Sequence, residues 1–191
     1  MNIEKEVRYL INKEQYKKLL ENTSPLEEEV DTLDLTFGYD GFNSLSKYGF
    51  VCRVRQKKNK IVIEIKNKIP EGWLEQEVKI DTLADGVNFF KCLNMKPYMY
   101  LYKKREVRKF KDLKIFIDKV ESLGDFVEIE YQDCNDSVNQ LAEFKKVVEI
   151  TSSEEDLYGN IIQEKLKDQD YKNIYETNLY NLIAKITKGE N

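Results

Sequence analysis

Two segments that lie far apart in the sequence carry acidic residues at alternate positions. Successive side chains of a β-strand point to opposite faces, so acids two positions apart share one face. The intervening positions are largely apolar, which indicates strands with one charged and one buried face. The two acidic pairs are Glu4 and Glu6 in residues 2–11, and Glu128 and Glu130 in residues 125–132. This repeated pattern constrains the fold more than any other feature of the chain.

The same alternation continues between those two segments. Six further segments are predicted to be strands: 30–39, 49–57, 60–68, 73–80, 98–109 and 113–120. Their charged faces, together with Arg8 of the first strand, carry Arg53, Arg55, Glu64, Lys66, Glu75, Glu77, Lys79, Lys103, Arg105 and Asp118. The opposite faces consist largely of Ile, Val, Leu, Cys and Tyr. We therefore expect an antiparallel sheet with charge concentrated on one side.

Helical patterns appear between the strands and after them. Asn12 and Gln15 form a capping-box pattern that predicts a helix over residues 13–22. Apolar residues at helical spacing predict further helices over 83–94, from 136 onward, over 154–167 and over 171–187. Residues 40–44 are predicted to form a turn-rich break. The expected organisation is one α+β domain over residues 1–191, with strands in about 2–132 and C-terminal helices in about 136–187.

The charged faces fit two architectures. An open sheet with helices on its apolar side would leave the charges in water. A closed barrel with helices outside would turn the charges inward and enclose acids and bases in a channel. Buried charges are costly unless they are paired or neutralised by ligands, so such an interior favours a highly charged ligand. Two Glu-x-Glu pairs and Asp118 suit one or two divalent cations, and the Arg and Lys side chains suit phosphate oxygens.

Composition excludes several kinds of chemistry. The chain of 191 residues contains no histidine, which excludes imidazole catalysis and histidine-ligated metals. Oxygen ligands favour hard cations such as Mg²⁺ or Mn²⁺. Charged residues make up 35% of the chain, but the net charge is only −4, so no surface for nucleic acid is indicated. Three dispersed cysteines and no long apolar run favour a soluble cytoplasmic protein without membrane contact.

The order of these motifs resembles that of CYTH domains, the triphosphate tunnel metalloenzymes. Glu4-Lys5-Glu6-Val7-Arg8 is similar to the family's N-terminal E-x-E-x-K signature, with Arg8 in place of Lys. The resemblance continues through Arg53-Val54-Arg55, Glu64-Ile65-Lys66, Glu75-Gln76-Glu77, Lys103-Lys104-Arg105, and from Asp118 to Glu128-Ile129-Glu130. The family's C-terminal Ser-Tyr motif matches poorly around Ser153 and Tyr158. The resemblance implies a closed eight-stranded antiparallel β-barrel that forms a triphosphate tunnel, with helices packed outside.

The resemblance also implies roles for individual residues. The metal ligands would be Glu4, Glu6, Asp118, Glu128 and Glu130, holding Mg²⁺ or Mn²⁺. The phosphate-binding residues would be Arg53, Arg55, Lys66, Lys79, Lys103 and Arg105. The catalytic groups would be Glu6, Glu130 and Arg8. Glu75 and Glu77 would hold a second metal or orient the basic side chains. Glu64 would belong to this group, or it would only form an ion pair with Lys66 or Arg55. Most Tyr and Phe side chains are expected to pack between the barrel and the helices.

The preferred function is metal-dependent hydrolysis of a linear triphosphate: inorganic triphosphate, thiamine triphosphate or a nucleoside triphosphate. In the first alternative, the same cage would convert ATP to cyclic AMP and pyrophosphate, as a class IV adenylyl cyclase does. In the second, the chain would bind nucleotides or polyphosphate without catalysis. The partner is therefore a small triphosphate-containing molecule rather than nucleic acid. A homodimer would form through the outer barrel face or the C-terminal helices.

Overall fold

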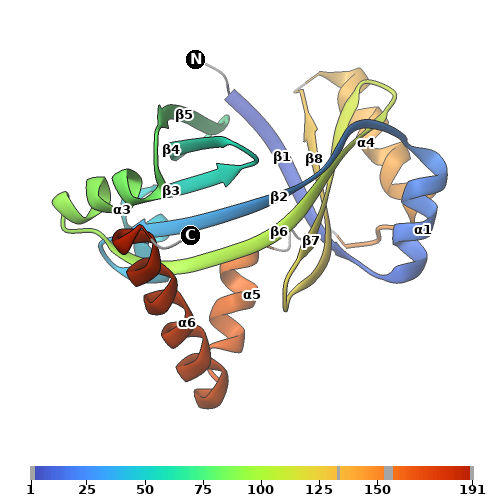
Figure 1. Ribbon diagram of the computed structural model, residues 1–191. Helices are drawn as coiled ribbons and strands as arrows, with labels where there is room; N and C mark the ends of the chain where they lie inside the picture. Colours follow the sequence, from blue (N-terminus) through green and yellow to red (C-terminus); the bar gives the residue numbers. More distant parts are fainter. Residues whose placement is uncertain (1–2, 133, 153–156, 190–191) are drawn as a thin grey trace.

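A computed structural model describes residues 3–132, 134–152 and 157–189, without the side chains of residues 3 and 4 (Figure 1). Its strands are β1 (Ile3–Ile11), β2 (Ser24–Gly38), β3 (Phe50–Lys57), β4 (Lys60–Ile69), β5 (Gly72–Ile80), β6 (Lys96–Phe110), β7 (Leu113–Val120) and β8 (Gly124–Tyr131). Its helices are α1 (Lys13–Asn22), the 3₁₀ turn η1 (Gly41–Asn43), α2 (Ser44–Tyr48), α3 (Leu83–Cys92), α4 (Asn135–Val148), α5 (Tyr158–Lys165) and α6 (Gln169–Lys188).

The eight strands form a closed antiparallel barrel in the order β1-β5-β4-β3-β2-β6-β7-β8. All pairs are antiparallel; direct turns join β3 to β4, β4 to β5, β6 to β7 and β7 to β8, and η1 with α2 joins β2 to β3. The barrel is closed by β1, which pairs with β8 from Lys5–Tyr131 to Ile11–Asp125. β1 and β5 pair over a short stretch, in which Ile3 lies opposite Leu74 and Glu4 opposite Trp73. The structure confirms the closed α+β barrel that the family resemblance implied, and it decides against the open sheet that the alternating pattern also allowed.

The register explains why the charged faces converge. Antiparallel partners directly opposite each other point to the same side of the sheet. Across the strand pairs, Arg53 lies opposite Glu64, Lys66 opposite Glu75, and Arg105 opposite Asp118. The same register therefore carries one charged face from strand to strand around the barrel. The barrel encloses this face, so the charges lie in its interior.

Two apolar clusters lie outside the barrel, between the strands and the helices, and a third reaches the interior cavity through Leu101 and Tyr158. On one side, α1 and α4 cover β1, β7 and β8, with Leu19 and Phe144 fully buried (Figure 1). On another side, α3 and α6 cover β2, β3 and β4 through Phe90 and Leu179. A third cluster joins α5 and α6 to β6, β7 and β8. Most domains bury their apolar side chains in the interior. Here most of them pack against the outside of the barrel wall, and the interior is polar.

Several boundaries differ from the sequence expectation. β2 begins at Ser24 rather than near residue 30, because two register shifts let its acidic first half pair with β6. The turn-rich segment after residue 40 contains η1 and the short helix α2, which ends at Gly49 with φ of 75°. The predicted helix over 154–167 is present as α5 from Tyr158, and residues 154–156 lie outside the described part of the chain. The capping box of α1 is confirmed.

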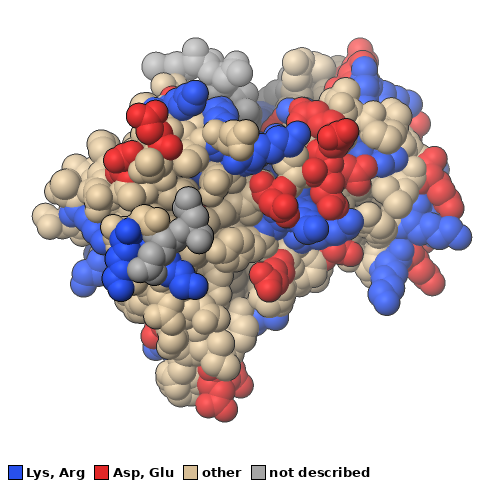
Figure 2. Space-filling model, in the orientation of Figure 1, with Lys and Arg blue, Asp and Glu red and all other residues tan. Residues whose placement is uncertain are grey.

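The outer surface carries charges of both signs without segregation. Figure 2 shows acidic and basic side chains interspersed over one face of the molecule. This distribution agrees with the mixed charge pattern of the sequence. None of the helices within the described ranges combines the length and the apolarity needed to cross a membrane.

Candidate functional site

A cavity of about 290 Å³ lies inside the barrel and receives charged side chains from all eight strands. Its basic lining residues are Arg8, Arg53, Arg55, Lys66, Lys103, Arg105 and Lys114. Its acidic lining residues are Glu6, Asp34, Glu75, Glu128 and Glu130. Such a concentration of guanidinium, ammonium and carboxylate groups in one enclosed space is costly unless the groups neutralise one another or a ligand. The cavity is therefore the candidate site.

Asp34 on β2 is the acceptor of one group of bases. Arg55 donates to it through two hydrogen bonds, from Nε at 2.7 Å and from Nη2 at 2.9 Å. Arg53 and Lys103 each approach the same carboxylate at 3.8 Å. Burial alone would raise the pKa of Asp34, but Arg55, Arg53 and Lys103 outweigh burial and hold it well below its usual range. Asp34 is therefore ionised in the folded protein at neutral pH.

Asp118 on β7 is the acceptor of a second group. Arg105 donates to both of its oxygens at 2.6 Å, and Lys103 donates at 3.0 Å. Tyr158 on α5 donates its hydroxyl hydrogen to the same carboxylate at 2.6 Å. Although burial opposes ionisation, Arg105 and Lys103 keep the pKa of Asp118 well below its usual range. Asp118 thus fixes the position of two bases that face the cavity.

Lys103 lies between the two carboxylates. Its side chain is 2% exposed, and its ammonium lies 5.4 Å from the centre of the Tyr158 ring. Burial and the neighbouring Arg105 lower the pKa of Lys103 to about 8, against the opposing effect of Asp118 and Asp34. Lys103 therefore stays protonated mainly because Asp118 and Asp34 lie beside it, and its charge is more sensitive to these partners than the charge of the other bases is.

Arg8 on β1 connects the acids of β8 to α5. Its Nε donates to Glu128 at 3.0 Å, and a second guanidinium nitrogen contacts the same oxygen. Its guanidinium carbon lies 4.4 Å from the centre of the Tyr158 ring, within range of a cation–π contact. Arg105 also reaches Glu128, at 3.1 Å. Burial raises the pKa of Glu128, but Arg105 and Arg8 lower it well below its usual value.

Two pairs of glutamates stand directly opposite each other on neighbouring strands. Glu6 of β1 faces Glu130 of β8, and Glu64 of β4 faces Glu77 of β5. Like charges in this position destabilise a sheet, because their Cβ atoms lie about 4.5–5.5 Å apart. Lys66 lies near this region, 3.6 Å from Glu6 and 2.8 Å from Glu75. A cation between the carboxylates would remove the remaining repulsion.

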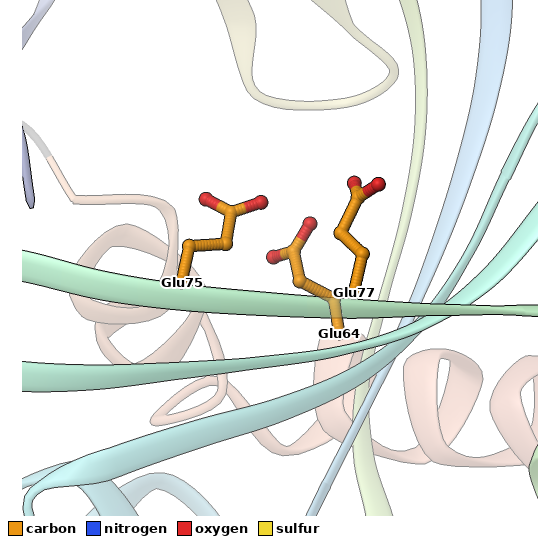
Figure 3. A group of neighbouring side chains, drawn as sticks. All are labelled: Glu64, Glu75 and Glu77. Atoms are coloured by element: carbon orange, nitrogen blue, oxygen red, sulfur yellow. The ribbon is translucent and has the colours of Figure 1, made fainter. Parts of the chain in front are cut away.

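Glu64, Glu75 and Glu77 form the one group of three or more acids in the described residues whose ligand atoms lie within 4.8 Å of one another. Figure 3 shows their side chains leaving β4 and β5 on the same side of the sheet. Burial and the charge of Glu64 raise the pKa of Glu75 to about 7. Burial acts in the same direction on Glu64, but Arg53 and Arg55 lower its pKa overall. Near neutral pH Glu75 is therefore partly protonated, and a bound cation would favour its ionised form.

The donor set of this group fits a hard divalent cation. It offers only carboxylate oxygens, which Mg²⁺ and Mn²⁺ prefer to soft ligands. One oxygen of Glu64 is buried and accepts no hydrogen bond within the described residues, although Arg53 contacts it in an ion pair. The group is therefore compatible with a bound metal.

A second, smaller cavity of about 220 Å³ adjoins the same bases. Arg55, Lys103 and Arg105 line both cavities, so they separate the two spaces. Lys57, Lys60 and Glu77 line only the smaller one, and Lys60 pairs with Glu77 at 2.6 Å. The interior is thus divided by a layer of ion pairs rather than open from end to end.

The structure brings most of the site residues predicted from the sequence to this interior. Those that line the larger cavity are Glu6, Arg8, Arg53, Arg55, Lys66, Glu75, Lys103, Arg105, Glu128 and Glu130. Glu64 and Asp118 are fully buried behind them, and Glu77 lines the smaller cavity. Lys79 is exposed and lines neither cavity, and the side chain of Glu4 lies outside the described part. The metal, phosphate and catalytic roles of these residues stay predictions.

Three contributors were not identified from the sequence. Asp34 has Thr32 and Thr36, not acids, two positions away on its strand, so the pattern of alternating acids did not indicate it. Tyr158 begins α5, in the helical part of the chain after β8, and only its weak match to the family's C-terminal motif indicated it; Ser153 lies outside the described residues. Lys114 lies within the predicted strand 113–120, on the same face as Asp118, but it was not named as a site residue; its register opposite Glu130 places it in the cavity.

Comparison with solved structures shows the fold in other organisms. A conserved hypothetical protein of Pyrococcus furiosus is 23% identical, with a TM-score of 0.68 over 83% of this chain and 99% of its own. The PH1012 protein of Pyrococcus horikoshii is 21% identical, with a TM-score of 0.69 and the same coverage. A Hippeastrum protein, described as a candidate adenylyl cyclase with a dominant triphosphatase activity, is 19% identical, with a TM-score of 0.56 over 78% of this chain and 89% of its own.

A search of curated proteins finds no match. The family model of the CYTH domain, in contrast, matches residues 2–158, which include all eight strands and reach Tyr158 at the start of α5. The matched region contains every residue that lines the charged cavity except three from α5. The chain therefore belongs to the CYTH domain family.

Proposed function

We propose that this protein is a metal-dependent hydrolase that binds a linear triphosphate inside its barrel and cleaves the terminal phosphate. The observation that carries the proposal is one cavity that combines seven basic side chains with Glu6 and Glu130, which lie directly opposite each other on β1 and β8. The bases match the oxygens of a polyphosphate, and the opposed acids match the cations that accompany it. The Hippeastrum protein supports the proposal, because a chain of this fold has triphosphatase activity.

The basic side chains would bind and orient the substrate. Arg53, Arg55 and Arg105 are each held by a buried carboxylate, which fixes their guanidinium groups before a ligand arrives. Preorganised donors of this kind stabilise developing charge without a reorganisation cost. Lys66 and Lys103 would add point charges to the same phosphates. Lys79 is proposed only as a peripheral contributor, because it is exposed.

The acidic side chains would hold the cation and the attacking water. A divalent cation would neutralise the phosphates and polarise the terminal phosphorus. The sequence offered two sets of candidate ligands: Glu4, Glu6, Asp118, Glu128 and Glu130 as the main set, and Glu75 and Glu77 for a second metal. The second set, together with Glu64, forms a compact group of carboxylates that suits a cation. Glu6 or Glu130 would orient the water and accept its proton. Asp118 would act mainly by positioning Lys103 and Arg105.

Product analysis tests the proposal. Purified protein with Mg²⁺ or Mn²⁺ receives inorganic triphosphate, thiamine triphosphate and ATP in separate reactions. We expect orthophosphate as the product, and a loss of at least about 100-fold in kcat for Glu130→Gln, since positioned acid–base groups contribute about 10²–10⁴-fold. Glu164→Gln is the matched control, because Glu164 is exposed and pairs only with Lys167 in the described part of the chain.

Two other results would contradict the proposal, and each would indicate a different function. Cyclic AMP and pyrophosphate from ATP would identify a cyclase that uses the same cavity for attack on the α-phosphorus. Absence of turnover with every substrate, combined with thermal stabilisation by triphosphate, would identify a binding module. In that second case Glu130→Gln would retain or improve affinity, since a pure anion binder gains from losing an acid.

A further inference from the structure

Four residues that line the smaller interior cavity form one row across neighbouring strands. Thr32 of β2 lies directly opposite Lys57 of β3 on one side and opposite Lys103 of β6 on the other. Lys57 in turn lies opposite Lys60 of β4. Because directly opposed residues point to the same side of a sheet, all four side chains face one space. The row therefore places three lysines and one threonine side by side.

The lysines of this row are only partly compensated by acids. Like charges directly opposite each other destabilise a sheet, and Lys57 and Lys60 stand in that position. Glu27 lies 3.5 Å from Lys57, and Glu77 lies 2.6 Å from Lys60. Both carboxylates belong to side chains that are more than a third exposed, so water weakens these ion pairs. An anion between the lysines would offset the remaining repulsion.

The two interior cavities differ in their balance of charge. Within the described residues, five basic side chains and one acid, Glu77, line the smaller cavity. Seven basic and five acidic side chains line the larger one. Asp34 and Asp118, which hold the bases shared by the two cavities, do not line the smaller cavity. The larger cavity therefore suits a polyphosphate together with its cations, and the smaller one suits an anion without a metal ion.

The hydroxyl of Thr32 is a second, independent indication of a ligand. Thr32 is 4% exposed, and its hydroxyl oxygen has no hydrogen-bond partner among the described residues. Nearly all buried polar groups are hydrogen-bonded, because leaving one unpaired costs its full desolvation penalty. A threonine hydroxyl has one hydrogen to donate, and an oxyanion accepts it. The hydroxyl and the lysines beside it thus meet the needs of the same ligand.

The size and the position of the smaller cavity restrict this ligand to a small ion. Its volume of about 220 Å³ corresponds to roughly seven water molecules of about 30 Å³ each. Pockets for larger organic ligands have volumes of about 300–1,000 Å³. Thr32 and Lys103 also line a groove of about 1160 Å³, whose walls include the exposed Lys58 and Lys104. A small ion therefore reaches the smaller cavity from outside without crossing the larger one.

We infer that the smaller cavity binds one orthophosphate ion without a metal, at a site separate from the triphosphate site. Lys57 and Lys60 supply positive charge, and the Thr32 hydroxyl donates a hydrogen bond to a phosphate oxygen. The anion has two sources. Phosphate in solution enters through the groove, and under the proposed function, on which this second source rests, phosphate cleaved in the larger cavity has only the layer of shared bases to cross.

Calorimetric titration with inorganic orthophosphate in buffer that contains EDTA tests the site directly. We expect Lys57→Gln to weaken phosphate binding about 10-fold, since hydrogen bonds between charged groups are among the stronger ones. Lys17→Gln is the matched control, because Lys17 is 79% exposed on α1, also pairs with a glutamate and lines neither interior cavity. Equal phosphate affinities for the Lys57→Gln, Lys17→Gln and unsubstituted proteins would overturn the inference.

Thr32→Val gives a readout that does not depend on charge. Without phosphate, its Tm should equal or exceed that of the unsubstituted protein, because the change removes a buried hydroxyl that lacks a partner. Orthophosphate should then raise the Tm of Thr32→Val less than it raises that of the unsubstituted protein. A clear fall in Tm without phosphate, with an undiminished response to phosphate, would show that the hydroxyl serves the fold and would overturn its role as a donor to the anion.

Triphosphate titrations separate this site from the proposed function. In the Glu130→Gln background with Mg²⁺, Lys57→Gln and Thr32→Val should each change the affinity for inorganic triphosphate less than about 2-fold, because neither residue lines the larger cavity. Equal losses of affinity for triphosphate and orthophosphate would overturn the separate site. Absence of hydrolysis would refute the proposed reaction and leave the phosphate site standing, since the titrations need no turnover.

Single-turnover reactions distinguish the two sources of the phosphate. Acid-quenched samples report cleavage of the triphosphate, and a phosphate-binding sensor reports orthophosphate that has left the protein. Release that lags behind cleavage, with a shorter lag in Lys57→Gln, identifies the reaction product as the occupant. Cleavage and release that coincide, together with phosphate binding in the titrations, identify phosphate from solution.

Discussion

Asp34 illustrates how one buried carboxylate organises several bases. Its side chain is 3% exposed, and Arg55 donates two hydrogen bonds to it. We expect Asp34→Asn to lower the free energy of unfolding by about 3 kcal/mol, because breaking a buried ion pair leaves the partner's charge uncompensated. Urea denaturation at pH 7 measures the change.

The control for this prediction is an exposed pair. Asp40→Asn removes a carboxylate 3.0 Å from Lys47 on the surface, where water solvates both groups. We expect no measurable shift in the urea midpoint for this variant, since exposed ion pairs contribute little. Equal midpoints for the two variants would show that Asp34 is not the acceptor on which the bases depend.

Glu75 gives stability a pH dependence. Its pKa rises from 4.5 to about 7 on folding, so the folded state binds a proton more tightly than the unfolded state. This contribution is complete below about pH 4.5 and is lost as the pH rises through 7. In metal-free buffer, the stability of the unsubstituted protein should therefore fall between pH 5 and pH 8 relative to Glu75→Gln, by at most roughly 3 kcal/mol. Parallel urea midpoints for the two proteins over this range would contradict the assignment.

At the residue scale, alternation predicted much of the site. Arg53, Arg55 and Lys66 could be placed on inward faces because a two-residue period fixes the direction of each side chain. Asp34 could not be identified as a site residue from the sequence, because one acid between apolar neighbours is equally typical of a strand face exposed to solvent. Tyr158 could not be placed either, because its contact with Asp118 depends on how α5 enters the barrel and leaves no local pattern.

Among the elements, α3 lies unusually close to the barrel wall. A Cβ atom on Gly86 would lie 2.6 Å from Val54 Cγ2 and 2.8 Å from Ile80 Cδ1. Gly86→Ala should therefore lower stability by about 1–3 kcal/mol through overpacking, although alanine favours a helix by about 1 kcal/mol. Thermal or urea unfolding checks the sign of the change.

Gly159 in α5 is the matched comparison. A Cβ atom there would meet only Phe42 Cδ1, at 3.9 Å, which is an ordinary contact distance. We expect Gly159→Ala to be neutral or slightly stabilising, since only the helix preference remains. Similar destabilisation at both glycines would show that close packing of α3 against the wall is not the cause.

Element boundaries were predictable where local chemistry determines them. The start of α1 could be predicted from Asn12 and Gln15, because a capping box satisfies its own backbone donors. The start of β2 could not, since its first half, Ser24–Glu29, is polar and extended only through pairing with β6. The helical turns η1 and α2 were also missed, because Gly41 and Asn43 favour turns of many kinds.

For the whole molecule, the charged interior makes stability depend on ligands. Any ligand that binds only the folded state adds about 2.7 kcal/mol at a concentration of 100 times its Kd. For a chain of this size, that should raise Tm by about 5–10 °C in the presence of a triphosphate and Mg²⁺. Differential scanning calorimetry with sodium chloride at equal ionic strength is the control. The same rise with sodium chloride would indicate a general salt effect and no specific binding.

The closure of the barrel by β1 and β8 also bears on how the protein is made. Lys5 pairs with Tyr131, and the core on this side of the wall joins Tyr9 and Ile11 to Val127 and Ile129. Because synthesis proceeds from the N-terminus, β1 leaves the ribosome long before β8 exists. Contacts between such distant segments form slowly, and until then the apolar side of β1 is exposed to aggregation and to chaperones. The first strand to be made is thus among the last to find its partner.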